Sequence, residues 1–275
     1  MTISAQLNRV LFVHAHPDDE SLYTGAVIAQ CVADGLEVMV VTCTRGEEGD
    51  ILDPLLSDAS PDKNDNLGEI RIEELSSALS VLGVRQHSFL GAPSRLFRDS
   101  GMVGRISNQH PHAFIRADLS EPVDLLAKTI IDFKPHVVVT YDPSGGYGHP
   151  DHIQTNIVTT KAVETARISA RISGIDWQTP AFFWCVIPDA ILAEAVVTQE
   201  NFASVNQFLH RTSSVEPDGE EEPIAVPVSG FIAEKVAALR CHRSQMGPDL
   251  FEGLSNPEIL ALIPKIELLL PSKKL

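Results

Sequence analysis

Two short clusters of charged and imidazole side chains have the types and spacing of a reactive site. The first follows an apolar run in Val10–Glu20, which reads VLFVHAHPDDE and contains His16, Asp18 and Asp19. His16 and Asp19 are three positions apart, so in the first turn of a helix their side chains would converge on one ion. Asp18 would then point elsewhere and remain free for proton transfer. An Asp at a strand-to-helix turn is also an ordinary helix N-cap, so this cluster alone fits either a site or a cap.

The second cluster favours a reactive site over a pair of helix caps, because it repeats the pattern. The segment Val137–His152 reads VVVTYDPSGGYGHPDH, again an apolar run that opens into a loop, and it ends in His149, Asp151 and His152. Parallel strands of one sheet bring their carboxyl ends to the same edge, and loops at that edge commonly bind ligands. We therefore expect the two clusters to meet there.

Together the clusters offer three metal ligands, His16, Asp19 and His152. Two imidazoles and one carboxylate leave a coordination position open, which is the pattern of catalytic zinc. Such an ion lowers the pKa of bound water towards about 7 and polarises a carbonyl. The same donors suit iron(II), so we predict one Zn²⁺ or Fe²⁺ per chain. His14, on the strand itself, is expected to be a buried, hydrogen-bonded residue rather than a ligand.

The remaining polar residues of the clusters fit the needs of amide hydrolysis. That reaction requires a base to activate water, stabilisation of an oxyanion, and an acid for the leaving amine. We assign Asp18 as the base, Tyr147 with the metal as the oxyanion partner, and His149 as the acid. Asp151 would orient one of the two neighbouring histidines by a hydrogen bond, with either one open as its partner. The glycines that flank Tyr147 fit either a mobile loop or a tight turn.

The hydrophobic pattern indicates how these residues are positioned. Short apolar, β-branched runs alternate with segments of helical periodicity, which is the rhythm of βαβ units. Runs that are apolar at every position predict parallel strands covered on both faces. We therefore predict an α/β, Rossmann-like fold with a mostly parallel sheet, helices on both faces, and the site at the carboxyl ends of the strands. The expected strands are Val10–Val13, Val38–Val41, Val137–Thr140 and Phe182–Ile187, and the clearest helical segments are Gly25–Ala33 and Ile70–Leu82.

Two long segments interrupt this rhythm. Glu48–Leu67 is rich in Asp, Pro and Asn, and Gly91–Ala113 is rich in Gly, Arg and His, so both are expected to be loops. Long loops in compact domains tend to be functional. We expect them to form walls of the substrate site.

The last third of the chain, from about residue 180 to 275, has a weaker pattern. Phe231–Arg240 has apolar residues at helical spacing, Asp218–Pro223 is an acidic turn, and Pro257–Leu275 is apolar and then basic. We predict one domain over residues 1–275 with this third as an elaboration, and leave open a boundary near Thr212–Pro223.

Composition excludes several classes of protein. The 275-residue chain has a formal net charge of −16 and no evident Lys and Arg patch, so nucleic acid and anionic membranes are not expected partners. No run of about 18 uncharged apolar residues occurs, and Met1 leads into a strand-like segment without a signal-peptide pattern. We expect a cytoplasmic protein with a small-molecule substrate. The four cysteines show no paired spacing and are predicted to be free and mostly buried: Cys31, Cys43, Cys185 and Cys241.

Other common enzyme motifs are missing from the sequence. Ser21 and Ser144 do not stand in a nucleophile elbow, and neither a G-x-G-x-x-G nor a G-K-[ST] phosphate loop occurs. Serine-hydrolase and nucleotide-binding functions are therefore disfavoured.

The sequence resembles a known family. A-H-P-D-D-E at Ala15–Glu20 together with H-P-D-H at His149–His152 is similar to the LmbE-like (PIG-L) N-deacetylase superfamily. VTCTRGEEGD at Val41–Asp50, RDSGM at Arg98–Met102 and YDPSGGYGHPDH at Tyr141–His152 look most like its MshB-type members from mycothiol biosynthesis. The resemblance is strong over about the first 165 residues and loose beyond them.

The resemblance implies the same metal ligands and the same base as the residues themselves, with His149, Asp151 and Tyr147 assisting. It adds three substrate-binding positions, Arg71, Asp99 and Asp50. An Arg or Asp can form paired hydrogen bonds to vicinal hydroxyls, although a surface ion pair is the commoner fate of such residues. Asp50 stands where the family pattern has Glu, so a contact there would be lost or relayed by water.

The implied reaction is zinc-dependent deacetylation of N-acetyl-glucosaminyl-inositol to the free amine and acetate. One alternative is a mycothiol S-conjugate amidase, but that group tends to have Pro before its H-P-D-H, where this chain has Gly148. Another is a deacetylase of a different N-acetylglucosaminide. A metal- or sugar-binding module without turnover would have no use for Asp18 beside Asp19, so the pattern favours an enzyme.

Overall fold

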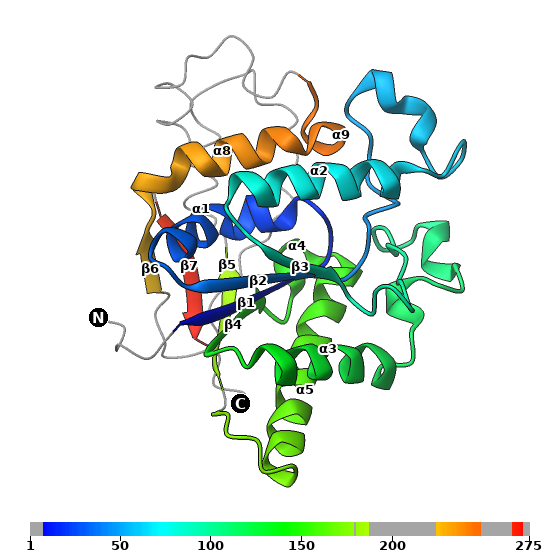
Figure 1. Ribbon diagram of the computed structural model, residues 1–275. Coiled ribbons are helices and arrows are strands. Elements are labelled where there is room, and N and C mark those ends of the chain that lie inside the picture. The colour runs from blue at the N-terminus through cyan, green and yellow to red at the C-terminus, as the bar shows by residue number, and fades with distance from the viewer. Residues whose placement is uncertain (1–7, 179, 187–223, 249–265, 272–275) are drawn as a thin grey trace.

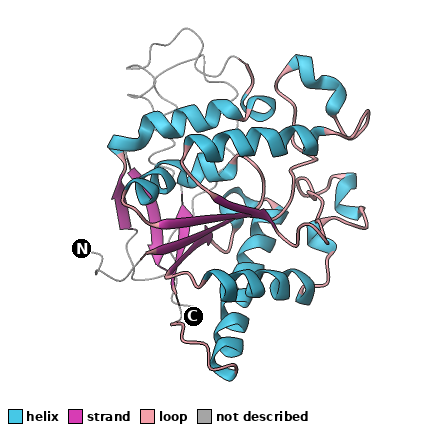
Figure 2. Cartoon of the chain, viewed as in Figure 1, coloured by secondary structure: helices cyan, strands magenta, loops and turns pink. Residues whose placement is uncertain are grey.

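A seven-stranded, mostly parallel sheet forms the centre of the protein (Figures 1 and 2). The computed structural model describes residues 8–178, 180–186, 224–248 and 266–271. The strand order is β3-β2-β1-β4-β5-β7-β6; the first five are parallel, β7 is antiparallel to β5, and β6 is antiparallel to β7. The strands are β1 (Arg9–His14), β2 (Glu37–Thr42), β3 (Gln86–Phe89), β4 (Val137–Tyr141), β5 (Ala181–Val186), β6 (Ile224–Pro227) and β7 (Ile266–Pro271).

Helices cover both faces of this sheet, as the sequence predicts (Figure 1). One face carries α1, α2 and α8, and the other carries α3 and α5. The helices are α1 (Asp19–Ala33), α2 (Leu67–Val81), α3 (Ser120–Phe133), α4 (Gly145–Gly148), α5 (Pro150–Ile172), α8 (Ile232–Cys241) and α9 (Arg243–Met246), and short 3₁₀ turns are η1 (Pro54–Ala59), η2 (Ile106–Gln109), η3 (Phe114–Arg116) and η4 (Ser229–Phe231).

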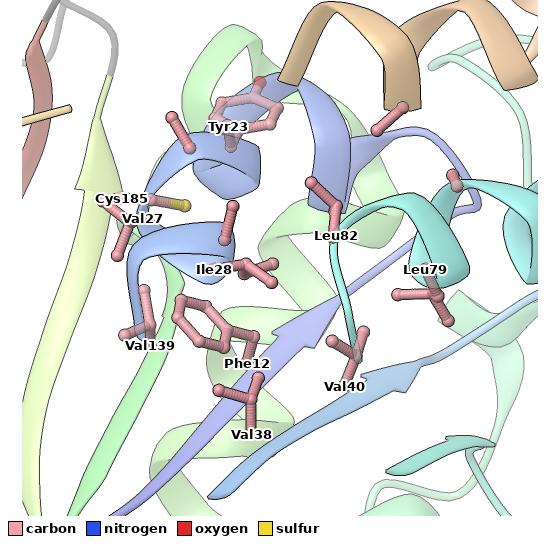
Figure 3. Close-up of a cluster of buried hydrophobic side chains, with 14 of the residues drawn as sticks. Phe12, Tyr23, Val27, Ile28, Val38, Val40, Leu79, Leu82, Val139 and Cys185 are labelled. Atoms are coloured by element: carbon pink, nitrogen blue, oxygen red, sulfur yellow. The ribbon is translucent and has the colours of Figure 1, made fainter. Parts of the chain in front are cut away.

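The two covered faces explain why β1 is apolar at every position. Phe12 packs into the core under α1 and α2, and Leu11 and Val13 pack into the core under α3 and α5. Figure 3 shows Phe12 beside Ile28 in the first of these cores. Successive side chains of a strand point to opposite faces, so both faces must be apolar when both are buried.

The sheet register brings the two reactive segments to one edge. β1 lies between β2 and β4, and it is parallel to both. Its pairing with β2 extends beyond the strand, since the Cys43 N–H donates to the His14 carbonyl and the Thr44 N–H donates to the Ala15 carbonyl. The loops that follow β1 and β4 therefore leave the sheet side by side.

The predicted strands are all confirmed within the described residues, with Ile187 outside them. α1 begins at Asp19, six residues before the predicted Gly25, because the polar residues of its first turn hide the apolar period. β3 was missed: its sequence QHSF has no apolar run, as suits a partly exposed strand at the edge of a sheet.

The two predicted loops contain short 3₁₀ turns rather than only irregular chain. η1 lies in the first loop and η2 in the second. In the last third of the chain, the predicted helix over Phe231–Arg240 is confirmed as α8. The predicted acidic turn and the open boundary near Thr212–Pro223 lie outside the described residues, as does most of Pro257–Leu275, of which β7 is described.

All four cysteines are free, and two of them, Cys43 and Cys185, are buried. Among the described helices, none combines the length and apolar character needed to span a membrane.

Replacing Phe12 by Ala should lower the free energy of unfolding by about 3–5 kcal/mol, because it opens a cavity in a fully buried site. Chemical denaturation would measure the change. Ile172→Ala is the control: this side chain is 79% exposed, so its loss should change stability by no more than about 0.5 kcal/mol. Similar losses in both variants would contradict the described core.

Candidate functional site

Three polar atoms from the two clusters form a nearly equilateral triangle. The distances are 3.4 Å from His16 Nδ1 to Asp19 Oδ2, 3.3 Å from His16 Nδ1 to His152 Nε2, and 3.4 Å from His152 Nε2 to Asp19 Oδ2. All three side chains are buried. These are the three residues that the sequence assigned as metal ligands.

The spacing of this triangle fits a bound ion better than a set of hydrogen bonds. Hydrogen bonds between nitrogen and oxygen are usually about 2.7–3.2 Å long. Ligand atoms about 2.0–2.2 Å from one tetrahedral ion are about 3.3–3.6 Å from each other. Two imidazoles and a carboxylate at these separations are therefore able to hold a metal ion.

Each of the three residues is held by a different local element. His16 lies in the turn after β1, outside the helix, and its backbone N–H donates to Asp19 Oδ2 at 2.9 Å. Asp19 is the first residue of α1, and His152 lies in the first turn of α5. The expectation that His16 itself lies in a helical turn was wrong, because α1 begins only at Asp19. The two side chains still come together, because the His16 N–H is bonded to the Asp19 carboxylate.

Tyr141, the last residue of β4, contacts two of the three residues of the triangle. Its hydroxyl donates to Asp19 Oδ2 at 2.7 Å and accepts from the Ala15 N–H at 2.8 Å. Its ring stacks on the His152 imidazole, with the ring centroids 4.1 Å apart. Sequence reasoning missed this residue. The signal was its position directly after the apolar run that precedes the second cluster.

Two further carboxylates lie beside the other nitrogen of His16. Its Nε2 is 3.3 Å from Asp151 Oδ2 and 3.5 Å from Asp99 Oδ1. Asp151 is held in turn by the Ser100 N–H, which donates to Oδ2 at 2.8 Å. The sequence left open which histidine Asp151 faces, and here it faces His16.

Two further groups of the described residues share His16 with the triangle and also have ligand atoms close enough to hold an ion. One consists of His16, His149 and His152, and the other of His16, Asp99 and Asp151. In the second group both carboxylates already accept backbone N–H donors, from Gly101 and Ser100. Because both carboxylates face His16 Nε2, they are placed to orient this ring while its Nδ1 faces the triangle.

Charge pairing sets the protonation states around the triangle. Burial alone would lower the pKa of His16, but Asp99, Asp151 and Asp19 together raise that pKa well above its usual value. Burial would raise the pKa of Asp19, yet His152 and His16 hold it well below its usual range. Asp19 is therefore a carboxylate, which is the form that a metal ligand needs.

Asp18 lies between His16 and Asp19 in the sequence, in a backbone conformation that is unusual for an Asp. Its φ is 109° and its ψ is −31°. Its Oδ2 is 2.9 Å from Arg71 Nη2 in a buried ion pair. Burial raises the pKa of Asp18 to about 7, although Arg71 acts to lower it. A carboxylate with this pKa is suited to accept a proton near neutrality.

His149 is the N-cap of α5, and its Nδ1 accepts the Asp151 N–H at 3.1 Å. This bond requires Nδ1 to be unprotonated, which leaves Nε2 to carry the proton of the neutral ring. Burial, together with the imidazoles of His16 and His152, lowers the pKa of His149 to about 2. The ring is therefore neutral at rest.

Tyr147 lies in α4, between glycines with positive φ. Its ring meets the rings of His152 and His149 edge-on, with centroids 5.0 and 5.9 Å apart. Burial raises the pKa of Tyr147, so the phenol is protonated at neutral pH. It is thus a hydrogen-bond donor beside the histidines.

The three residues predicted to bind substrate are in different surroundings. Arg71 is buried, where it donates to the carbonyls of Gly46 and Pro17 besides pairing with Asp18. A Cβ at Gly46, whose φ is +69°, would clash with the Arg71 guanidinium. Asp99 is also buried, and the Glu48 and Gly101 N–H groups donate to it.

Asp50 lies apart from this buried cluster. Its carboxylate is more than half exposed and forms an ion pair with Arg105 at 2.7 Å, between the two long loops. His14, which the sequence predicted to be a buried, hydrogen-bonded residue rather than a ligand, is fully buried on β1. Its Nε2 lies 2.9 Å from Thr24 Oγ1. Burial lowers the pKa of His14 to about 4.

The sequence matches a known protein family and its individual members. The family model of the GlcNAc-PI de-N-acetylases (PIG-L) matches residues 11–163. A 1D-myo-inositol 2-acetamido-2-deoxy-alpha-D-glucopyranoside deacetylase from Thermomonospora curvata is 45% identical over 258 residues, which cover 90% of this chain and 85% of the relative.

Solved structures share the fold at lower identity. N,N'-diacetylchitobiose deacetylase from Pyrococcus horikoshii superimposes with a TM-score of 0.60 at 19% identity, covering 98% of this chain and 85% of that one. The 4-carboxy-2-hydroxymuconate hydratase GalB from Pseudomonas putida superimposes with a TM-score of 0.56 at 18% identity, covering 96% of both chains. At these identities the likeness concerns the fold alone.

Replacing Tyr141 by Phe should weaken metal binding by about 10–100-fold, because the partner that orients the Asp19 carboxylate is lost while the stacked ring is retained. Competition with a chromogenic chelator would measure the affinity for Zn²⁺.

Tyr23→Phe is the matched control. The Tyr23 hydroxyl is buried and has no hydrogen-bond partner in the described part of the chain, although its ring also lies near His152. Its removal should leave the affinity within about threefold of the native value. Unchanged affinity in Tyr141→Phe would contradict the importance of this bond.

Proposed function

The chain belongs to the GlcNAc-PI de-N-acetylase (PIG-L) family, and we propose that it removes the acetyl group of 1D-myo-inositol 2-acetamido-2-deoxy-α-D-glucopyranoside by hydrolysis. The products are the free amine and acetate, as in mycothiol biosynthesis. One observation carries the choice of substrate: relatives of that name are 40–45% identical over most of this chain. The complete set of buried acid, base and ligand residues supports turnover rather than binding alone.

We propose that His16 Nδ1, Asp19 Oδ2 and His152 Nε2 hold one Zn²⁺ ion. The separations of 3.3–3.4 Å between these atoms fit one tetrahedral ion. In this assignment Asp151 and Asp99 orient the His16 ring through its other nitrogen. When bound, the ion supplies a Lewis acid that activates water and polarises the acetamide carbonyl. The same donors suit iron(II), which is the alternative metal.

Asp18 is the proposed general base. Its carboxylate is adjacent to the ligand Asp19, and Arg71 holds it in place through a 2.9 Å ion pair. The raised pKa of Asp18 makes it a better proton acceptor than an ordinary exposed Asp. It would take the proton of the attacking water, while Asp151 and Asp99 orient the His16 ring from its far side.

Tyr147 and His149 are the proposed donors to the reacting amide. Tyr147 enters the reaction protonated and would donate a hydrogen bond to the oxyanion. His149 is neutral at rest, so it would act as an acid only after gaining a proton during the reaction. The proton taken up by Asp18 is the available source, and the leaving amine is its destination.

Substrate hydroxyls are proposed to bind Arg71, Asp99 and Asp50. Arg71 and Asp99 are already engaged in buried bonds, so sugar hydroxyls would have to share or replace these partners. Asp50 is exposed and paired with Arg105, where a hydroxyl would reach it directly or through water. The long loops would thus contact the inositol end of the substrate.

Acetate release from the pseudodisaccharide tests the reaction. The native protein should hydrolyse this substrate only with metal bound. A chelator should therefore abolish the activity, and added Zn²⁺ or Fe²⁺ should restore it. Asp18→Asn should reduce kcat by about 10²–10⁴-fold because the base is removed, while metal remains bound. Asp34→Asn, on an exposed residue at the end of α1, is the control and should keep native activity.

Full activity in Asp18→Asn would overturn the proposed base. No activity on this substrate, combined with turnover of a mycothiol conjugate or another N-acetylglucosaminide, would retain the metal chemistry and overturn the proposed substrate.

The pH profile tests the Arg71–Asp18 pair. Asp18 must be ionised to act as a base, so kcat/KM should fall as the pH drops through its pKa. That pKa is about 7 in the metal-free protein, and a bound cation would lower it. Arg71→Met removes a charge that lowers the pKa, so the acid limb should move to higher pH, whereas Arg71→Lys should move it less. An acid limb that stays in place in Arg71→Met would contradict this assignment.

A further inference from the structure

A buried hydrogen-bond chain links the last third of the protein to the proposed base. His242 follows the last residue of α8, and its Nε2 lies 2.7 Å from Glu20 Oε1. The second oxygen of Glu20 accepts the backbone N–H of Asp18 at 2.9 Å. His242 and Glu20 are both fully buried. These hydrogen bonds therefore connect His242, which is far along the sequence, to the backbone of Asp18.

The backbone that this chain reaches is strained. A φ of 109° with a ψ of −31° is rarely adopted by residues other than glycine, because such a backbone conformation is unfavourable for a residue with a Cβ. It persists only where the surroundings determine it by several contacts. At Asp18 these contacts are the Glu20 carboxylate on the N–H, the Ser21 and Leu22 N–H groups on the carbonyl, and Arg71 on the side chain.

Glu20 is more than an acidic residue that stabilises the start of a helix. Acidic residues in the first turn of a helix are usually solvated, and their interaction with the helix dipole is modest. Burying a carboxylate is costly unless it is paired and hydrogen-bonded. Glu20 is fully buried and has three described partners: the His242 ring, the Ser21 hydroxyl and the Asp18 N–H.

α8 is itself fixed against α1, so His242 has a defined position. α8 packs on α1 and α2, and Figure 1 shows it next to α2, above α1 in that view. Lys235 of α8 donates to the Leu22 carbonyl of α1 at 2.7 Å and pairs with Glu267 of β7 at 2.6 Å. The Glu267 carboxylate in turn accepts the Ala26 and Val27 N–H groups of α1.

We propose that His242 is a positioning residue for the reaction: by holding Glu20, it keeps the Asp18 backbone in the conformation that presents the carboxylate. The inference rests on the proposed function, in which Asp18 is the base. His242 acts through Glu20 and is not a ligand or a proton donor in this proposal. The last third of the chain thus takes part in the reaction through one buried imidazole.

Two substitutions at one position test this. His242→Leu removes the hydrogen-bond donor to Glu20, whereas His242→Gln retains an amide N–H near the position of Nε2. In the zinc-loaded full chain, His242→Leu should lower kcat by about 10–100-fold, with KM and the Zn²⁺ dissociation constant each within about threefold of native. His242→Gln should recover most of this loss.

Lys235→Met is the matched control for a merely structural effect. It breaks another buried bond between α8 and α1 and leaves Glu267 unpaired, so it should lower the stability of the fold. Glu20 and Asp18 keep their partners in this variant. Its kcat, measured at a temperature where all variants are folded, should therefore stay near the native value.

A readout independent of turnover is the hydrogen exchange of the Asp18 amide, followed by NMR. In the native protein the Glu20 carboxylate protects this N–H; in His242→Leu it should exchange about tenfold faster or more, and in His242→Gln and Lys235→Met at nearly the native rate. The same exchange rate in the native protein and His242→Leu would overturn the proposal. So would native kcat in His242→Leu, or an equal loss of kcat in Lys235→Met.

Failure of the proposed function is distinguishable from failure of this inference. If the native protein with zinc releases no acetate from the pseudodisaccharide, the proposed function is wrong. The exchange rates of the Asp18 amide then decide the positioning role alone, by the same comparison of variants.

Discussion

The Tyr141 hydroxyl connects the two strands on which the site depends. It accepts the Ala15 N–H beyond the end of β1 and donates to the Asp19 carboxylate at the start of α1. Tyr141 itself is the last residue of β4. Parallel pairing of β1 with β4 brings these groups to the same edge. Without that register, His16 and His152 would leave the sheet at different places, and no three-atom triangle would form.

Excess negative charge is the second constraint on this region. Asp18, Asp19, Asp99 and Asp151 are all buried there, and Arg71 is the buried cation paired with one of them. Burial raises the pKa of both Asp18 and Asp151. Buried carboxylates at this density need positive charge nearby, and the imidazoles supply it only when protonated. A divalent cation in the triangle would supply it permanently.

The sequence predicts those parts of the fold and site that have a local signal. Apolar runs mark β1, β2, β4 and β5, and two His-Pro-Asp motifs mark where the loops lead into α1 and α5. β3 gave no such signal because an edge strand can be polar. The links from Arg71 to Asp18 and from His242 to Glu20 also had none, since a hydrogen bond between residues 222 positions apart leaves no periodic pattern in one sequence.

The fold itself does not select the reaction. A hydratase and a deacetylase both superimpose on this chain at similar TM-scores and similarly low identity. What the sheet fixes is an edge at which loops can place polar groups, and functions differ by which groups those loops carry. The assignment of amide hydrolysis therefore depends on the family match and on the residues at the edge. Of these, Asp18 matters most, because a metal-binding site alone would not require a strained backbone that holds a second carboxylate beside the proposed ligand Asp19.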